Sequence, residues 1–264
     1  MSTGPKVALR EVTKHFRKPD GEVYPALGPV SLEINAGEFV AIVGPSGCGK
    51  STLLRMVAGL SPPTSGAVEL DGAAVRTVSR SVGFLFQDDA LLPWRTVEDN
   101  IALGLRLRKV PEADVRRRTA EWIAKVGLGE FARSYPAQLS GGMKKRTAIA
   151  QTLIYDPSVI LMDEPFAHLD AQARYIMQMD LLDLCADGGR TILFVTHDLD
   201  EAIGLADTVV VLSAGPHSRI CALETVGIPR PRDLLAVRGD PRFGELSELL
   251  WRRLYEEVRG AYGR

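Results

Sequence analysis

The fold is decided by one stretch of the chain: Gly44, Pro45, Ser46, Gly47, Cys48, Gly49, Lys50, Ser51 and Thr52. Residues 44–51 fit the pattern G-x-x-x-x-G-K-[ST], in which glycines let backbone N–H groups close around phosphate oxygens. The apolar run Phe39 to Val43 precedes the stretch, and helix-forming Leu53 and Leu54 follow it. Strand, glycine turn and helix in this order predict an α/β fold with an anion-binding loop.

Three side chains of this loop have expected roles. Lys50 is expected to reach the β- and γ-phosphates of ATP, and the Ser51 hydroxyl to ligate Mg²⁺. Cys48 lies inside the loop, so alkylation of its thiol is expected to block ATP binding. The alternative, a flexible glycine turn that matches by accident, does not account for the flanking strand and helix.

A second motif ends in two carboxylates. Val159 to Met162 form an apolar run, and Asp163 and Glu164 follow it directly. Ligands bind beyond the carboxyl ends of parallel strands. Asp163 is therefore suited to hold Mg²⁺ through water, and Glu164 to polarise a water that attacks the γ-phosphate. Without the phosphate loop, the same pair would indicate only a solvated turn or a helix cap.

The chain as a whole divides into α/β and helical parts. Short strand-like runs, beginning with Val7 to Leu9 and Val30 to Ile34, stand on both sides of a stretch in which apolar residues recur at helical spacing. We expect one domain over residues 1–264, with an α/β core (1–91 and 158–228), a helical insertion (92–157) and a C-terminal helical tail (229–264).

Composition narrows the function classes. The 32 Lys and Arg residues nearly balance 33 Asp and Glu residues, which leaves a net charge of −1 and no global attraction to nucleic acid or anionic lipid. The 3 cysteines are widely separated, indicate neither a disulfide framework nor a zinc site, and fit a reducing cytosol. No uncharged run of about 18 apolar residues occurs, so we expect any membrane-spanning part to belong to another chain.

A third motif consists of Leu139, Ser140, Gly141, Gly142 and Met143. A serine followed by two glycines is an ordinary helix start, here of a helix expected to begin near Met143, and it also offers an anion-binding helix N-terminus. Alone this is a weak signal, but its position shortly before the strand that ends in Asp163 favours a functional interpretation.

With these motifs in order, nearly the whole chain resembles the ATP-binding-cassette ATPases. Gly44–Ser51 is similar to their Walker A loop, Ile160–Glu164 to their Walker B strand, and Leu139–Gly142 to their signature motif. The resemblance implies a P-loop NTPase core of the RecA-like α/β class. It also implies an antiparallel β subdomain and an inserted helical signature subdomain.

Three single residues extend the resemblance. Gln87 matches the Q-loop glutamine, which senses the γ-phosphate and the metal, and His197 matches the switch histidine, which steadies the γ-phosphate and the attacking water. Asp170 matches the D-loop aspartate. The implied cofactors are ATP and Mg²⁺. The implied catalytic residues are Glu164, His197, Gln87 and Lys50, and the implied metal ligands are Ser51, Gln87 and Asp163.

Three aromatic side chains have open assignments. Phe16 is a candidate to stack on the adenine ring, with Tyr24 as its competitor and ordinary packing as the alternative. The residues Asp88 to Trp94 match the family segment that faces a coupling helix of the membrane domain. The alternative for Trp94 is a simple packed aromatic.

The resemblance also implies partners. In the family, residues matching Ser140 to Gly142 contact the ATP held by the other subunit, which implies a head-to-tail homodimer around two nucleotides. A finer resemblance, to importers of nitrate, sulfonates and taurine, is carried by Leu92–Trp94, Asp163–Phe166 and Thr196–Asp198. It implies integral membrane permeases, a periplasmic or extracellular solute-binding protein and a peripheral location at the cytoplasmic face of the membrane. No nucleic acid partner is expected.

Three positions depart from the common family pattern. Lys145 stands where glutamine usually precedes Arg146, Gln151 where arginine is usual, and His168 where a small residue is typical. None of the three is expected to touch the hydrolysis residues. For His168 an exposed, neutral position competes with an effect on the D-loop.

Two further stretches, one basic and one apolar, each allow a structural and a functional interpretation. The basic run from Arg106 to Arg118 is interleaved with Glu112 and Asp114, which favours a solvated helix face over a lipid or nucleic-acid patch. The apolar stripe from Leu246 to Val258 has helical spacing, and packing on its own domain is preferred to docking on a partner.

Two rival functions stay open at this stage. A cassette that drives lipid traffic or export keeps the ATPase and changes the partner. A soluble cassette ATPase that acts on nucleic acid or ribosomes belongs to a different class, and the single cassette and net charge of −1 count against it. A simple P-loop kinase does not explain the motif at Leu139 to Gly142.

Overall fold

Two β-sheets organise the molecule, and the computed structural model describes residues 4–167, 169–186 and 189–261. The larger sheet has the strand order β10-β9-β3-β8-β7-β6. Its strands are β3 (Phe39–Val43), β6 (Val82–Leu85), β7 (Val159–Asp163), β8 (Thr191–Val195), β9 (Thr208–Leu212) and β10 (Ile220–Thr225). All neighbouring pairs are parallel except β9 with β10.

The central strands of this sheet are buried from end to end. Every residue of β3, β7 and β8 is buried, because helices or the second sheet cover both faces. In β3, Ala41 and Val43 join one core cluster while Val40 and Ile42 join the other. This explains why these strands have continuous apolar runs instead of alternating ones.

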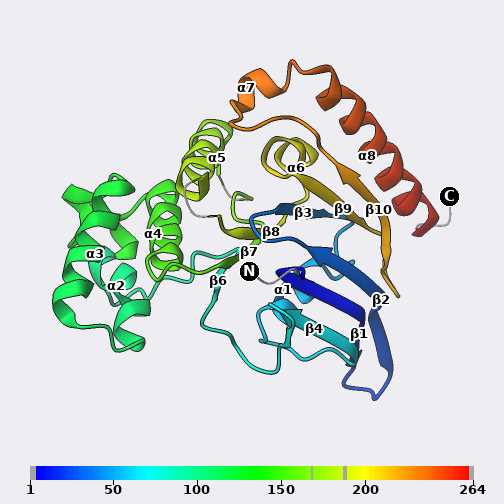
Figure 1. Ribbon diagram of the computed structural model, residues 1–264, viewed down its shortest axis with the longest axis horizontal. Coiled ribbons are helices and arrows are strands. Elements are labelled where there is room, and N and C mark those ends of the chain that lie inside the picture. Colours follow the sequence, from blue (N-terminus) through cyan, green and yellow to red (C-terminus); the bar gives the residue numbers. More distant parts are fainter. Residues whose placement is uncertain (1–3, 168, 187–188, 262–264) are drawn as a thin grey trace.

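The smaller sheet is antiparallel, with the order β2-β1-β4-β5. Its strands are β1 (Val7–Arg17), β2 (Val23–Ile34), β4 (Ser65–Leu70) and β5 (Ala73–Ala74). Helix α1 (Lys50–Val57) shares one apolar core with strands of both sheets and lies between them in Figure 1. The loop before α1 is thereby held between two rigid layers.

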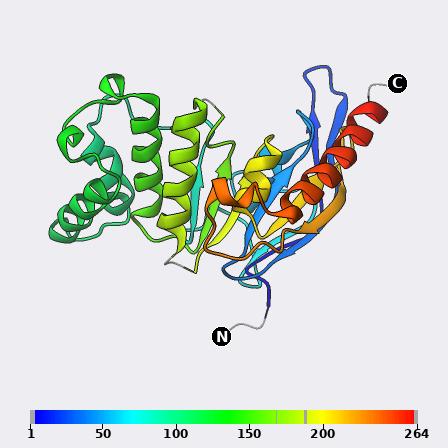
Figure 2. The ribbon, with the colours of Figure 1, turned by 90° about the horizontal axis from the view of Figure 1, so that it is seen from above.

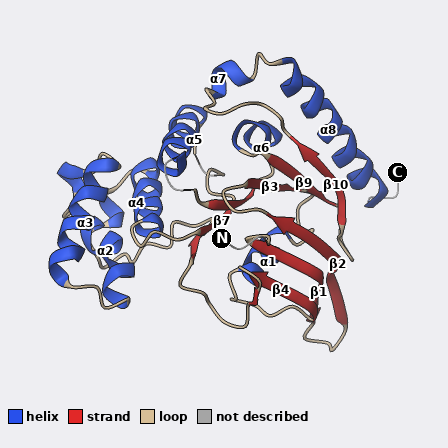
Figure 3. Ribbon diagram, in the orientation of Figure 1, coloured by secondary structure: helices blue, strands red, loops and turns tan. Residues whose placement is uncertain are grey.

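Three helices form the other end of the molecule. They are α2 (Val97–Leu107), α3 (Glu112–Lys125) and α4 (Gly141–Leu153), with short 3₁₀ turns at Gly129–Phe131 and Pro136–Gln138. Figure 1 and Figure 2 show these helices, in green, at the opposite end from the C-terminal helix, in red. Figure 3 shows that this region contains helices and loops while the strands gather elsewhere.

The remaining helices cover the larger sheet and its edge. They are α5 (Ala171–Ala186), α6 (Leu199–Leu205), α7 (Leu234–Val237) and α8 (Pro241–Ala261). Leu250 of α8 is fully buried, and Leu246 and Leu254 pack against the large core. The apolar stripe of the tail therefore packs on its own domain, as expected. Within the described residues, no helix is long and apolar enough to cross a membrane.

The fold matches the expected class, a mixed α/β core with an antiparallel sheet and a helical region. Several boundaries differ from the sequence-based ones. The first strand runs past Leu9 to Arg17, because pairing with β2 continues to Arg17 and Val23 where side chains are exposed. Helix α4 begins at Gly141, two residues before the expected Met143, because Ser140 caps it.

The basic run forms a solvated helix face, as expected. Arg106 contacts Asp99 and Glu112, and Arg117 contacts Asp114 and Glu121. All these side chains are substantially exposed, so the pairs lie at the solvated surface of the helices.

Candidate active site

The loop of residues 44–51 connects the end of β3 to the start of α1, and its shape requires glycine. A Cβ on Gly44 would lie 2.8 Å from Cys48 Sγ and 2.9 Å from the Leu212 carbonyl oxygen. Gly49 has a φ of +95° and caps α1, and a Cβ there would lie 2.8 Å from Leu27. The glycines of the motif therefore serve close packing and a left-handed turn at the helix N-terminus.

Lys50 lies across this loop. Its Nζ donates hydrogen bonds to the carbonyl oxygens of Gly44, 2.8 Å away, and Pro45, 3.1 Å away, and the residue is buried. The ammonium group and the N-terminus of α1 place positive charge in the same loop. This combination favours an anion, and a phosphate group fits it.

Cys48 is fully buried behind the loop. Burial raises the pKa of its thiol, and nearby Lys50 offsets this only in part. Alkylation needs both the thiolate and access to it, so an alkylating reagent reaches Cys48 only when the loop opens. The expected block of ATP binding is therefore limited by loop opening, a constraint that the sequence does not reveal.

Ser51 and Asp163 meet at the end of the loop. The Ser51 hydroxyl donates to Asp163 Oδ1 over 2.8 Å. Burial raises the pKa of the Asp163 carboxyl, and adjacent Glu164 adds to this effect, while the Ser51 hydrogen bond opposes it. A hydroxyl and a desolvated carboxylate side by side are oxygen donors of the kind that Mg²⁺ prefers.

The residues around Ser51 and Asp163 determine which kind of metal site this edge of the sheet can form. The described part of the chain contains no group of three or more His, Cys, Asp or Glu residues that could hold a metal ion. Mg²⁺ typically keeps waters and uses one or two protein oxygens together with substrate phosphates. The pair Ser51 and Asp163 fits that pattern, because it supplies two oxygens next to the phosphate loop.

Glu164 and His197 form a second pair. Glu164 Oε2 lies 3.2 Å from His197 Nδ1, and Glu164 has a left-handed φ of 44°. Its backbone N–H donates to the Val195 carbonyl, which holds the strained turn after β7 against β8. The imidazole is 63% exposed, whereas the carboxylate is 22% exposed. The histidine thus faces solvent with one nitrogen already oriented by Glu164.

The ends of four parallel strands bring these groups together. In the sheet register, Ile42 pairs with Val195, Asp163 with Val195, and Leu85 with Met162. The phosphate loop, the two carboxylates, His197 and Gln87 therefore follow neighbouring strands at one sheet edge. The Gln87 side chain is exposed. Among the described contacts, its backbone carbonyl accepts a hydrogen bond from Lys145, and its side-chain amide makes none.

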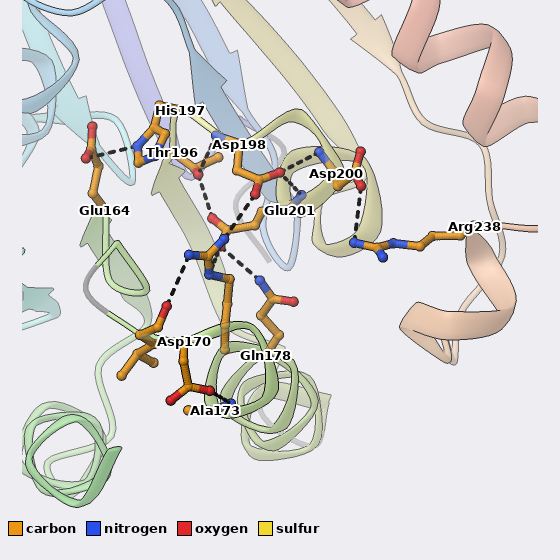
Figure 4. A network of polar contacts seen from close by, with 12 residues as sticks. Glu164, Asp170, Ala173, Gln178, Thr196, His197, Asp198, Asp200, Glu201 and Arg238 are labelled. Atoms are coloured by element: carbon orange, nitrogen blue, oxygen red, sulfur yellow. Dashed lines mark hydrogen bonds and ion pairs between the residues drawn. The ribbon is translucent and has the colours of Figure 1, made fainter. Parts of the chain in front are cut away.

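A polar network stands behind His197 (Figure 4). The Thr196 hydroxyl donates to Glu201 Oε2 over 2.6 Å, and the Asp198 N–H donates back to Thr196 Oγ1. Arg174 of α5 contacts Asp198 and the carbonyl of Leu169. The network links the backbone before Asp170 to the backbone around His197.

Glu201 is the buried acid of this network. Desolvation raises the pKa of its carboxyl, opposed by hydrogen bonds from Thr196 and Gln178. Asp170, next to the network, accepts a hydrogen bond from the N–H of Ala173 at the start of α5. Sequence reasoning gave Arg174 and Glu201 no role. The available signal was Asp198 followed three residues later by Glu201, a pattern typical of a capped helix start.

The signature residues lie on the surface of the same chain. Ser140 caps α4 by accepting a hydrogen bond from the Met143 N–H over 3.3 Å. Ser140 and Gly141 are exposed, and the nearest neighbour of a Cβ on Gly141 would be Leu169, 3.9 Å away. The described contacts do not join these residues to the phosphate loop.

The aromatic candidates are separated by their exposure. Phe16 and Tyr24 are register partners on β1 and β2, and Phe16 is 44% exposed with the Lys14 ammonium 5.3 Å from its ring. Tyr24 is half-buried, with its hydroxyl close to Gly215. Trp94 is 71% exposed, so it is not the packed aromatic considered as its alternative.

One expectation about the unusual positions is wrong. Lys145 does touch the candidate site, because it contacts the backbone of Gln87 and the side chain of Asp89. The expectation failed because the contact depends on how α4 packs against the segment after β6. Gln151 lies on α4, and His168 lies outside the described residues.

The sequence model of the ABC transporter family matches residues 27–167, more than half of the 264 residues. The chain belongs to the ABC transporter family. The expected ATP-binding-cassette ATPase is confirmed, and this ABC ATPase hydrolyses ATP to drive transport.

Named relatives of this ABC ATPase come from several organisms. In Synechococcus elongatus, a bicarbonate transport ATP-binding protein and a nitrate import ATP-binding protein are 44% and 43% identical over 93% and 96% of this chain. The chain spans only 37% and 39% of their length. An aliphatic sulfonates import ATP-binding protein of Bacillus thuringiensis is 45% identical, with 80% of this chain and 82% of that protein covered.

A solved structure carries the same fold. It is a dimeric, post-hydrolysis ATP-binding cassette, MJ0796, bound to ADP and Pi, and it is similar with a TM-score of 0.74 and 32% identity. The similarity covers 84% of this chain and 100% of the solved one. The expected cassette fold is therefore confirmed.

Proposed function

We propose that this ABC ATPase is the nucleotide-binding subunit of an importer for a small anion of the nitrate, bicarbonate or sulfonate type. The support is the 43–45% identity to subunits with those names, of which the sulfonate protein is covered over most of its length. The resemblance carried by the motifs around Trp94, Glu164 and His197 implies a related class of solutes, namely nitrate, sulfonates and taurine. The solute itself is selected by other subunits.

The observation that carries the ATPase mechanism is the 3.2 Å contact between Glu164 and His197 at the edge where Ser51 meets Asp163. In this proposal Lys50 and the backbone of residues 44–52 hold the phosphates. Glu164 orients and polarises the attacking water, and His197 steadies the γ-phosphate. Ser51, Asp163 and Gln87 would hold Mg²⁺, which would supply neutralising charge for the phosphates.

The complete site is formed by two chains. Ser140, Gly141 and Gly142 lie on the surface, away from the phosphate loop of their own chain, and so are available to the nucleotide of a second copy. The similar solved cassette is a dimer. A head-to-tail homodimer places each signature motif on the partner's ATP, with Asp170 at the same interface.

The remaining partners are membrane proteins. The face that docks on a permease is formed by the segment Asp88 to Trp94, in which Trp94 is 71% exposed. The subunit then sits peripherally at the cytoplasmic face of the membrane, and a solute-binding protein supplies the anion from the other side.

Within the chain, residues 92–157 act as the helical signature subdomain, next to the α/β core (1–91 and 158–228) and the tail (229–264). Adenine stacks on Phe16, the more exposed of the two candidates.

Affinity purification from gently solubilised native membranes, followed by mass spectrometry, tests the assignment. Recovery of a multi-spanning permease in about equal amount, together with a solute-binding protein, is expected. A Trp94→Ala variant should recover less permease, whereas Trp251→Ala, at a tryptophan that is also mostly exposed, should recover the normal amount. Recovery of export machinery, ribosomes or nucleic acid in place of the permease would contradict the importer function and leave the ATPase intact.

A further inference from the structure

Lys145 is a buried cation at the junction between α4 and the segment that follows β6. Its side chain is only 6% exposed, and Nζ lies 2.8 Å from Asp89 Oδ1. The same Nζ donates a hydrogen bond to the backbone carbonyl of Gln87 over 3.3 Å. One ammonium group therefore joins the helix of the signature motif to the segment of Gln87.

The contact between Lys145 and Asp89 is an ion pair, and its angles are not those of a hydrogen bond. Asp89 Oδ1 has no hydrogen-bond partner within normal angles, although the ammonium is 2.8 Å away. The Asp89 side chain is 25% exposed, so the pair is largely shielded from water on the lysine side. A buried lysine without its counter-charge is strongly disfavoured. Conformations in which Lys145 and Asp89 stay in contact therefore have a lower free energy than conformations in which the two side chains separate.

The helix makes this contact a stiff connection. Lys145 is four residues after Gly141, so the two positions lie on one face of α4, a single turn apart. Ser140 caps the first turn, and Thr147 Oγ1 donates to the Met143 carbonyl in the next. Because the turn is hydrogen-bonded, it moves as one unit, so a movement of Lys145 also moves Gly141.

We propose that Lys145 is a positioning residue, which couples the position of Gln87 to that of Ser140–Gly142 through its ion pair with Asp89. The inference rests on the proposed function, in which Gln87 meets the γ-phosphate of its own chain and Ser140–Gly142 meet the partner's nucleotide. A shift of Gln87 toward the γ-phosphate is transmitted through Lys145 to the N-terminus of α4. The common family residue at this position, glutamine, carries no charge to pair with Asp89.

Three variants test the coupling in the full-length dimer: Lys145→Met, Asp89→Asn and the double variant. Each single change should lower kcat for ATP about tenfold while KM stays within about threefold, because the phosphate loop is untouched. The double variant should be no slower than the slower single variant, since both changes break the same contact. Lys145→Arg, which retains the charge, should recover most of the turnover.

A matched control exists on the antiparallel sheet. Lys6 and Asp71 form an ion pair of the same 2.8 Å length beside β1 and β4, whereas Gln87 follows β6 of the other sheet. Lys6→Met and Asp71→Asn should leave kcat and KM unchanged. Trp94 offers a spectroscopic readout: in a Trp122→Phe, Trp251→Phe background, its ATP-dependent fluorescence change should be reduced by Lys145→Met and retained in Lys6→Met.

The outcomes separate this inference from the proposed function. A folded Lys145→Met variant with normal turnover would overturn the coupling, as would losses in the double variant that multiply. If Lys145→Met does not fold, Asp89→Asn carries the test, because its position is partly exposed. Normal turnover in Gln87→Ala would instead contradict the proposed role of Gln87, whatever Lys145 does.

Discussion

Ser51 donates its hydroxyl hydrogen to Asp163 over 2.8 Å, joining the first turn of α1 to the end of β7. The two residues are 112 positions apart in the chain. Neither reaches the other through helix or strand pairing, so the contact depends on the packing of α1 against the larger sheet. It also places a carboxylate whose pKa is raised by burial next to a positively charged loop.

Asp163→Asn should stabilise the protein in the absence of nucleotide at neutral pH. The raised pKa means that the folded state holds the Asp163 proton to higher pH than the unfolded state does. The penalty for ionising the buried carboxyl therefore grows as pH rises from the ordinary value of about 4 to the raised folded-state pKa, and stays constant above it. Thermal unfolding measured from about pH 3 upward should show the melting temperature of the variant rising relative to that of the wild type once pH passes about 4, and the difference should persist at pH 8. A variant that melts lower at pH 8 than the wild type would contradict this sign.

Glu164→Gln should bind ATP and hydrolyse it slowly. The amide keeps the shape of the side chain but cannot polarise water, so a fall in kcat of about a hundredfold or more is expected. ATP should then hold the variant as a stable dimer in size-exclusion chromatography. Glu69→Gln, on β4 beside Arg10, is the control and should turn over normally. Near-normal hydrolysis by Glu164→Gln would remove Glu164 from the proposed mechanism.

The sequence predicted best where burial is complete. The run Val159 to Met162 differs from the observed β7 by one residue, because a strand buried on both faces has an uninterrupted apolar signal. Asp163, the last residue of β7, and Glu164, the next residue, were assigned to one edge for the same reason. The hairpin of β1 and β2 was underestimated, since backbone pairing continues there after the apolar pattern ends.

The sequence predicted least where a contact depends on tertiary packing. Lys145 and Gln87 are 58 positions apart, and a lysine on a helix is normally solvated. Arg174 likewise meets Asp198 and Leu169 only because α5 packs beside the turn after β8. Periodicity reports which face of a helix is apolar, but not which loop meets a single polar residue on that helix.

Thr196→Val should destabilise the protein more than it alters nucleotide affinity. The hydroxyl is buried, donates to Glu201 and accepts from the Asp198 N–H, and valine of equal shape can do neither. Leaving these buried groups unsatisfied costs about 1–3 kcal/mol, measurable by denaturant unfolding. Thr208→Val, which breaks a partly buried hydrogen bond to Glu38, is a milder control. An unchanged midpoint in Thr196→Val would show that the network behind His197 contributes nothing to stability.

Trp94→Ala should separate ATP hydrolysis from transport. The side chain is 71% exposed, so its removal should change the free energy of unfolding by no more than about 0.5 kcal/mol and leave the hydrolysis of the isolated subunit intact. In membranes reconstituted with the permease, the same variant should lose transport, because the docking face loses its largest apolar side chain. Trp251→Ala, 63% exposed on α8, is the matched control and should transport normally. Equal transport in the two variants would place the permease contact elsewhere on the surface.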